Sequence, residues 1–375
     1  MSPSPLTSLF REHIPCEGTI PCEGTIPCEG TIPCEGSIPR GGGEGTDFKS
    51  VPFRIIPGAS PMTHGKSMAL TAGTLEELCI KQNESMKKHT SFKVGGPADL
   101  FARPRSIGTL EKILGMAKAH ELPLTIMGSG TNLLVKDKGI RGIVISMAHL
   151  KCPTTITPLQ QGKYRVQVSS GTILASLYRE TMAQGIGGIG FAAGIPGTVG
   201  GAVMMNAGTS GGTVSDVVES IDILDSQKGI ITLPKSALHF THRCLTLGPA
   251  FPKRQRPVLV GATLIMSHQD KKKIKAQWQA LLEKRKNNQP VKGAGAGCFF
   301  KNPPQGKSAG ELIDRAGLKG FKIGNAMVSS KHANFILNAG QATAQEIMDL
   351  KHVIEKEVHN RFGIRLENEV KIEGE

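Results

Sequence analysis

The sequence predicts an α+β fold, in which antiparallel hairpins and amphipathic helices are mixed along the chain. Strand-like segments at 220–225 and 229–233 flank a short turn, a pattern typical of a hairpin. Helical patterns at 110–117 and 274–285 carry apolar residues on one face and stand between further strand-like segments. This mixture argues against a simple βαβ repeat.

Taken in order, the predicted elements begin at about residue 72. Besides the segments above, we expect strands at 124–127, 140–146, 164–168, 257–266 and 369–372, and a helix at 174–184. The patterns Ser308–Glu311 and Thr343–Glu346 are capping boxes, which predict two more helices. Those helices end at Gly317 and Gly363.

Length and charge narrow the class of protein. A chain of 375 residues usually forms two or three domains. It contains no apolar run near the roughly 20 residues that span a bilayer, so we expect no membrane partner. The net charge of +14 is spread out, and its densest run, 271–273, begins a predicted helix. Such a distribution favours small polyanionic ligands over nucleic acid.

Eight cysteines do not indicate a disulfide framework here. Four belong to a hexapeptide repeat, and the others lack the spacing of metal ligands, so no metal site is expected. The N-terminus also lacks the pattern of a signal peptide. We therefore expect a reducing, cytoplasmic location. The repeat cysteines are Cys16, Cys22, Cys28 and Cys34, and the scattered ones are Cys79, Cys152, Cys244 and Cys298.

The first 70 residues form a separate low-complexity tail. Residues 14–37 are four copies of the hexapeptide Ile-Pro-Cys-Glu-Gly-Thr, with Ser in place of the last Thr. Because each copy contains Pro and Gly, neither a helix nor a paired strand is favoured. We predict that residues 1–70 are disordered, with no assigned role.

Two glycine-rich segments are candidates for phosphate binding. Gly128–Leu134 directly follows a predicted strand and offers backbone amides together with Ser, Thr and Asn side chains. Gly194–Ala202 can lay backbone amides along a planar ring or a pyrophosphate. Neither matches the Walker A or dinucleotide-fold pattern.

A third segment, Gly293–Pro303, carries a candidate reactive group. Cys298 ends a run of small residues that allow close approach of a ligand. With an ordinary pKa near 8.5, its thiol is mostly protonated at neutral pH and can donate a proton. The alternative is a buried, inert cysteine in a glycine-rich turn. We expect Cys298 to confer sensitivity to oxidants, because an exposed thiol can be oxidised.

Several sequence words together resemble the UDP-N-acetylenolpyruvoylglucosamine reductase (MurB) family, and its shorter, second type in particular. They occur in family order from about residue 75 to the end, over about four-fifths of the chain. The words are Lys88–Asp99, Gly128–Leu134, Gly194–Gly208, Gly297–Pro303, Ala309–Asp314, Gly317–Gly320, Val328–Phe335 and Glu369–Val370.

The resemblance implies a MurB-like (PCMH-type) flavin fold, in which two domains clasp FAD and a third α+β domain covers the substrate. We expect domain 1 at 71–148, joined by a C-terminal strand at 366–375, domain 2 at 149–287 and domain 3 at 288–365. The family's FAD contacts then fall on Gly128, Ser129, Gly130, Thr131, Asn132, Leu133, Gly194, Ile195, Pro196, Gly197, Thr198, Gly200, Gly201 and Ala202.

The implied activity is an NADPH-consuming reduction of UDP-N-acetylglucosamine enolpyruvate to UDP-N-acetylmuramate, a step of peptidoglycan precursor synthesis. Hydride passes from NADPH to FAD and then to substrate C3, after which C2 is protonated. The resemblance implies catalytic roles for Arg243, Cys298 and Glu369, with Cys298 in a position where the family usually has serine. It implies substrate contacts for Arg285, Lys286 and Asn302, and we expect a monomer.

Some alternatives stay open on the sequence. A related flavin oxidase is one, although such enzymes often attach flavin through His or Cys and the first glycine loop contains neither. A flavin-sensing module without turnover is another, and a basic nucleic-acid binder is a distant third. His242 and Thr209-Ser210 stand where the family commonly has tyrosines, which puts local packing and ligand contacts in doubt.

Overall fold

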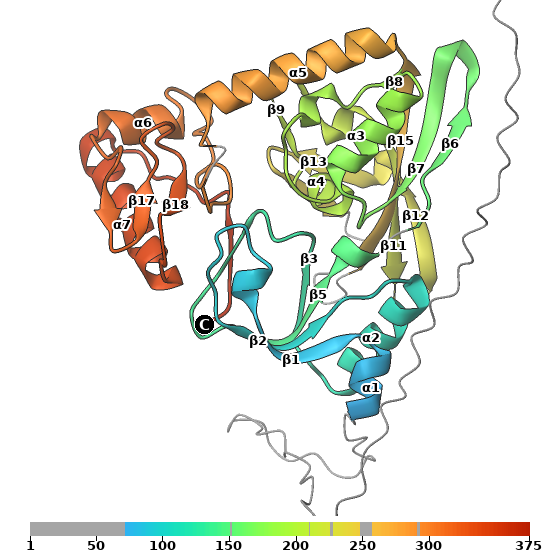
Figure 1. The fold of residues 1–375 in the computed structure, drawn as a ribbon, viewed down its shortest axis with the longest axis horizontal. Helices are drawn as coiled ribbons and strands as arrows, with labels where there is room; N and C mark the ends of the chain where they lie inside the picture. The colour runs from blue at the N-terminus through green and yellow to red at the C-terminus, as the bar shows by residue number, and fades with distance from the viewer. Residues whose placement is uncertain (1–71, 151, 210, 226–227, 248–256, 291–292) are drawn as a thin grey trace, which may run out of the picture. The chain divides into compact units, whose positions relative to one another are not determined.

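The computed structural model describes residues 72–375, except 151, 210, 226–227, 248–256 and 291–292 (Figure 1). The predicted tail with its repeats, and Ser210, lie outside the described residues. The helices are α1 Ala72–Glu77, α2 Ile107–Ala119, α3 Leu174–Ala183, α4 Val199–Met204, α5 Lys271–Asn288, α6 Ala309–Arg315 and α7 Ala344–Phe362. They are interleaved with strands, so the α+β prediction is confirmed.

The first sheet has the strand order β1-β2-β5-β3 (Figure 1). Strand β1 pairs antiparallel with β2, whereas β2 and β3 both run parallel to β5. Helix α2 packs on this sheet through Leu110 and Ile113, which are fully buried. The strands are β1 Ile80–Ser85, β2 Pro97–Ala102, β3 Leu124–Met127 and β5 Ile140–Ser146.

The second sheet is antiparallel throughout, with the order β12-β11-β15-β7-β6 and β8 paired beside β15. Helices α3 and α4 contribute Leu177 and Val203 to the core of this region. Tyr178 of α3 stacks on Trp278 of α5 with ring centroids 3.4 Å apart, which fastens α5 to it. The strands are β6 Thr155–Pro158, β7 Lys163–Ser169, β8 Ile186–Gly187, β11 Val218–Asp225, β12 Gly229–Pro234 and β15 Val258–His268.

Shorter pairings complete the strand inventory of the described residues. Strand β9 pairs with β10 and β13 pairs with β14, and all four lie between residues 208 and 247. Strands β16, β17 and β18 form a three-stranded sheet between residues 322 and 338. Their bounds are β9 Gly208–Thr209, β10 Gly212–Thr213, β13 Leu238–Thr241, β14 Cys244–Leu247, β16 Lys322–Ile323, β17 Ala326–Val328 and β18 Ile336–Asn338.

The C-terminal region shares its core and one strand pair with the N-terminal part. Helices α6 and α7 bury Leu312, Ile347 and Leu350 in one cluster with Phe92 and Leu134 from the first region. Strand β19 Lys371–Glu373 then pairs parallel with β4 Leu133–Val135, which begins within the first glycine-rich segment. The chain end is therefore anchored beside that segment.

The predicted capping box is formed at α7, whereas only one of its two hydrogen bonds is formed at α6. Thr343 and Glu346 form both hydrogen bonds of a capping box at the start of α7, and Gly363 ends this helix in a left-handed conformation. At α6, Ser308 accepts the Glu311 amide as predicted. The Glu311 carboxylate, however, lies 3.1 Å from the Arg315 guanidinium, which competes for it, and the return bond of the box is not formed.

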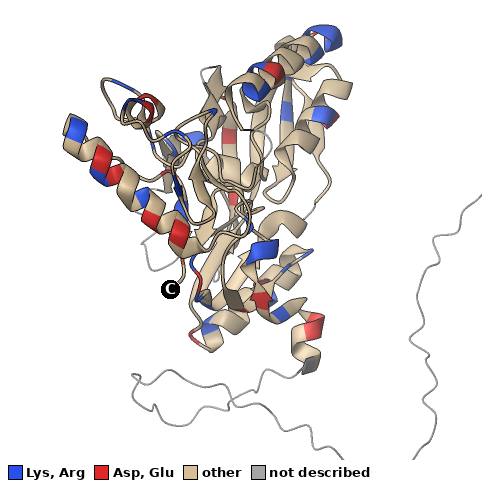
Figure 2. Cartoon of the chain, turned by 60° about the vertical axis from the view of Figure 1, so that its left-hand side comes forward, with Lys and Arg blue, Asp and Glu red and all other residues tan. Residues whose placement is uncertain are grey.

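Lys and Arg lie on several elements, with Asp and Glu among them (Figure 2). On α7, for example, Lys351 contacts Glu355 and Arg361 contacts Glu357. Within the described part of the chain, no helix is both long and apolar enough to cross a membrane.

Candidate active site

The two glycine-rich segments lie against each other. A Cβ atom added at Gly128 would come within 2.5 Å of Thr198 Oγ1, and one at Gly197 within 2.9 Å of Thr131 Oγ1. The Thr131 hydroxyl donates to the Pro196 carbonyl at 3.3 Å. Because only glycine leaves room at such contacts, the backbones of the two segments can approach each other closely.

The first segment, Gly128–Leu134, has the features of a ligand cradle. Gly130 has φ +66° and packs on the His89 carbonyl so closely that no side chain fits. Ser129 Oγ is buried and has no hydrogen-bond partner within the described residues, an arrangement that a ligand acceptor would satisfy. Leu133 begins β4 and is buried. This orphaned hydroxyl beside closely packed glycine backbone fits the diphosphate of FAD.

Backbone amides at the start of α4 are already used within the protein. The amide of Val199 donates to Thr172 O, that of Gly200 to Ser170 O, and that of Gly201 to Thr198 Oγ1. Ala202 and Ile195 likewise donate to main-chain carbonyls. These five amides are therefore not available as hydrogen-bond donors to a phosphate. The second segment can still contact a cofactor through its glycine-rich surface, where a ligand can approach the backbone closely.

Cys298 lies between a glycine-rich run and a buried anchor. Gly297 precedes it at φ +81°, and among the described residues no atom beyond its chain neighbours lies within 4 Å of where a Cβ would be. Phe299 and Phe300 after it are buried. The Glu369 amide donates to the Phe299 carbonyl at 2.8 Å. The thiol segment and the strand-like segment that carries Glu369 are therefore joined by a backbone hydrogen bond.

Arg243 reaches the same place from the hairpin β13-β14. It occupies the second position of the turn at φ +59°, a conformation that costs a non-glycine residue roughly 1–2 kcal/mol. Its Nη1 donates to the Gly208 carbonyl at 3.0 Å. Its Nε lies 3.1 Å from Glu369 Oε1, within ion-pair distance but not aligned for a hydrogen bond. The strained turn thus aims the guanidinium at Glu369.

Cys298, Arg243, Arg285 and Glu369 are close enough to interact electrostatically. Burial, reinforced by the negative charge of Glu369, raises the pKa of Cys298 to about 12, although Arg243 and Arg285 oppose the rise. Burial also raises the pKa of Glu369, against the effect of Arg243 and Lys301. Cys298 is consequently a neutral thiol at physiological pH, held beside two cations.

The expected substrate residues fall into different surroundings. Arg285 is half-buried on α5, where its Nη1 donates to Ala193 O at 3.4 Å and its side chain packs on Gly194. Burial lowers the pKa of Arg285, and the Cys298 charge acts in the opposite direction. Asn302 Oδ1 accepts the Ala309 amide at 3.1 Å, so this oxygen caps α6.

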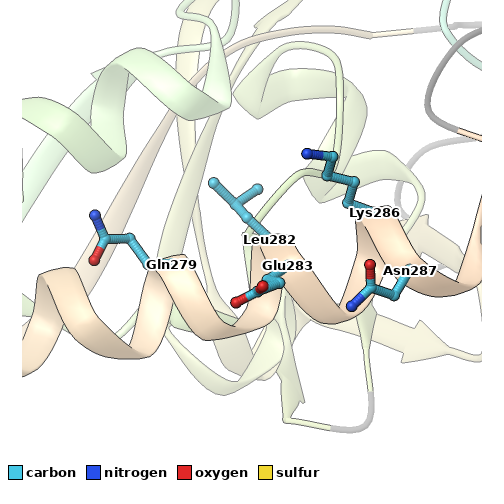
Figure 3. Close-up of a pocket in the computed structure, with 5 residues that line it drawn as sticks. All are labelled: Gln279, Leu282, Glu283, Lys286 and Asn287. Carbon is cyan, nitrogen blue, oxygen red and sulfur yellow. The ribbon is translucent and has the colours of Figure 1, made fainter.

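Lys286 lies on the exposed side of α5, where five residues of this helix line a hollow of about 320 Å³ (Figure 3). The Lys331 ammonium donates to the Lys286 carbonyl at 2.6 Å. The lining residues are Gln279, Leu282, Glu283, Lys286 and Asn287.

His242 occupies the other turn position of the hairpin, beside Arg243. Its pKa is lowered by burial and by the charges of Arg243 and Lys301. Among the described residues, no group of His, Cys, Asp or Glu is arranged to hold a metal ion.

Asparagines connect the segments of the site, and their positioning roles were missed from the sequence. Asn132 Nδ2 donates to the Glu369 carbonyl at 3.0 Å, which links the first glycine-rich segment to the acid. Asn206 Nδ2 donates to Thr241 O at 3.1 Å and so supports the Arg243 hairpin. Asn334 binds both main-chain groups of Phe300. Each lies in a recognised sequence word, but nothing local indicates its partner.

Comparisons with known proteins agree with this geometry. Residues 98–233 match the family model of an FAD binding domain, and residues 289–373 match that of the UDP-N-acetylenolpyruvoylglucosamine reductase C-terminal domain. The chain is 40% identical over 304 residues to UDP-N-acetylenolpyruvoylglucosamine reductase of Desulfosudis oleivorans, covering 79% of this chain and 95% of that relative. The chain belongs to the UDP-N-acetylenolpyruvoylglucosamine reductase family.

Two further members of the UDP-N-acetylenolpyruvoylglucosamine reductase family support the assignment. The Moorella thermoacetica enzyme is 40% identical over 307 residues, which cover 81% of this chain and 97% of that protein. The crystal structure of MurB from Thermus caldophilus superposes with a TM-score of 0.64 at 32% identity, covering 79% of this chain and all of that one. The MurB-like flavin fold is thereby confirmed.

Proposed function

We propose that this protein reduces UDP-N-acetylglucosamine enolpyruvate to UDP-N-acetylmuramate with FAD as cofactor and NADPH as reductant. The observation that carries the proposal is the convergence of Cys298, Arg243 and Glu369 from three distant parts of the chain. It is supported by the FAD-binding family match and by curated relatives named for this reduction.

FAD would lie along the two facing glycine-rich segments. Ser129 Oγ offers an unsatisfied hydroxyl to the diphosphate, and the glycines at 128 and 197 let the cofactor approach the backbone. Bound FAD would supply the chemistry of hydride transfer between NADPH and substrate C3.

The residues of this chain would stabilise the negative charge that develops at C2 and supply the proton that C2 accepts. Hydride addition at C3 leaves an electron pair on C2, delocalised toward the adjacent substrate carboxylate. The Arg243 guanidinium, fixed by Gly208 and by Glu369, would stabilise that negative charge. Arg285, which interacts electrostatically with Cys298, would assist it.

Cys298 would then protonate C2. The S–H bond breaks, a C–H bond forms at C2, and the resulting thiolate remains beside Arg243 and Arg285 until it is reprotonated. The pKa of about 12 keeps the donor fully protonated beforehand. Glu369, whose pKa burial raises, would return the proton to the thiolate or stabilise the enolic form.

Substrate binding is proposed for Arg285, Lys286 and Asn302. The two cations on α5 suit the diphosphate or the carboxylate of the substrate, and the hollow beside Lys286 has room for part of it. Asn302 retains only its amide nitrogen for this purpose, because its oxygen caps α6. We further propose a monomeric cytoplasmic enzyme; its described cysteines are all free thiols.

The proposal is tested by following NADPH absorbance with purified holoenzyme, with and without UDP-N-acetylglucosamine enolpyruvate. We expect a bound-flavin spectrum and NADPH loss that depends on substrate. Cys298→Ala should still be reduced by NADPH but should not be reoxidised by substrate, whereas Cys298→Ser should retain part of the rate. Flavin without substrate-dependent turnover would refute the proposed activity.

A further inference from the structure

Asn334 forms a two-point clamp on the main chain beside Cys298. Its Oδ1 accepts the Phe300 amide at 2.9 Å, and its Nδ2 donates to the Phe300 carbonyl at 2.8 Å. Its own carbonyl also accepts the Phe299 amide at 2.7 Å. Asn334 is 2% exposed, so water does not compete for these bonds.

The opposite edge of the same segment is bound by the strand-like segment that carries Glu369. The Phe299 carbonyl accepts the Glu369 amide at 2.8 Å, and the Lys301 amide donates to Glu367 O at 2.8 Å. The segment 299–301 is therefore held between Asn334 on one side and residues 367–369 on the other. This arrangement sets the separation between the Cys298 and Glu369 backbones.

The chain before Cys298 is restrained farther from the thiol, at the Ala294 carbonyl, which accepts the Asn338 amide at 2.8 Å, and at the buried Ala296. Gly293, Gly295 and Gly297 alternate with alanines there, and Gly297 is in a left-handed conformation. Glycine leaves the backbone free to adopt many conformations. Among the described residues, the hydrogen bonds nearest the thiol are therefore those of Phe299 and Phe300 on its C-terminal side.

We propose that Asn334 is a positioning residue for proton delivery, which holds the Cys298 thiol at its distance and angle to the reacting carbon. This inference rests on the proposed function of Cys298. A primary amide suits the task because it accepts and donates at once, which matches the N–H and C=O of one residue. Loss of the clamp lets the segment shift while leaving the glycine-rich cofactor segments in place.

The variant Asn334→Ala in the holoenzyme separates positioning from general stability. NADPH should reduce the bound flavin within about twofold of the wild-type rate, and reoxidation by the enolpyruvyl substrate should slow about 100-fold. The matched control is Asn338→Ala. Asn338 also bridges main-chain groups, at Phe92 O and the Gly340 and Ala342 amides, but in the described part of the chain its side chain forms no hydrogen bond to residues 298–301. Equal slowing of both half-reactions, or the same split in Asn338→Ala, overturns the inference.

A second variant, Asn334→Asp, tests the clamp even if Asn334→Ala does not fold. Above its pKa the introduced carboxylate accepts the Phe300 amide but repels the Phe300 carbonyl. Below its pKa the carboxyl group can also donate, which restores both bonds. The reoxidation rate should therefore recover toward wild type as pH falls, with no matching change in wild type. A variant that stays slow at every pH, or that is never slow, contradicts the clamp.

Thiol labelling distinguishes failure of this inference from failure of the proposed function. In folded Asn334→Ala, iodoacetamide should modify Cys298 at least about tenfold faster than in wild type, because the thiol segment opens to solvent. This readout needs no substrate turnover. Unchanged labelling overturns the positioning role, whereas increased labelling in an enzyme without substrate-dependent turnover refutes only the proposed function.

Discussion

Cys298 should be an unusually unreactive thiol. Its pKa of about 12 results first from burial and then from the negative charge of Glu369. The exposed Cys79 and Cys152 provide internal references for the labelling rate. An unperturbed thiol has a pKa near 8.5. A difference of about 3.5 pKa units lowers the thiolate population of Cys298 about 3000-fold at neutral pH.

Reactivity falls less than the thiolate population does. A thiolate of higher pKa is the better nucleophile, which recovers nearly half of the difference on a logarithmic scale. The net expectation is alkylation of Cys298 about 100-fold slower than that of Cys79 and Cys152. Oxidation by peroxide should be suppressed in the same way, contrary to the oxidant sensitivity expected for an exposed thiol. The difference has a physical cause, since the thiol is half-buried and its charged form is desolvated.

The assay is timed iodoacetamide labelling of the native holoenzyme, followed by peptide mass spectrometry of each cysteine. Glu369→Gln removes the charge that raises the Cys298 pKa, so this variant should label faster than wild type. Denatured protein, in which all cysteines should react alike, is the control. Native Cys298 that labels as fast as Cys79 would refute the reasoning.

Three further predictions concern neighbouring groups. Gly128→Ala places a methyl group 2.5 Å from Thr198 Oγ1 and should weaken FAD binding by about 1–3 kcal/mol, measurable by flavin fluorescence; unchanged affinity would contradict the cofactor position. Arg243→Lys cannot hold both Gly208 and Glu369, so flavin reoxidation by substrate should slow about 100-fold in stopped flow, and a near-normal rate would exclude its charge-stabilising role. Because burial raises the folded pKa of Glu369 above 4.5, its ionisation opposes folding at higher pH. Glu369→Gln should therefore lessen the fall in stability above about pH 4.5 in denaturant titrations, and an unchanged pH profile would count against the raised pKa.

Local chemistry in the sequence was sufficient for much of the fold. The strands predicted at 124–127 and 140–146 coincide with β3 and β5. These predictions succeeded because a run of apolar residues between turn residues is a signal contained within a few neighbouring positions. The capping box at Thr343 and the stop at Gly363 are equally local, since each bond spans a single helical turn. The sequence words also sufficed to recognise the family.

The tertiary structure alone decided the properties that depend on distant segments. Arg243 meets Glu369 only because the β13-β14 hairpin and the C-terminal segment converge, and no spacing in the chain encodes that distance. The amides of α4 were expected to face a ligand, but packing against Thr172 and Ser170 engages them. The pKa of Cys298 likewise depends on burial and on charges brought from three regions, because desolvation is a property of the packed surroundings and not of the residue itself.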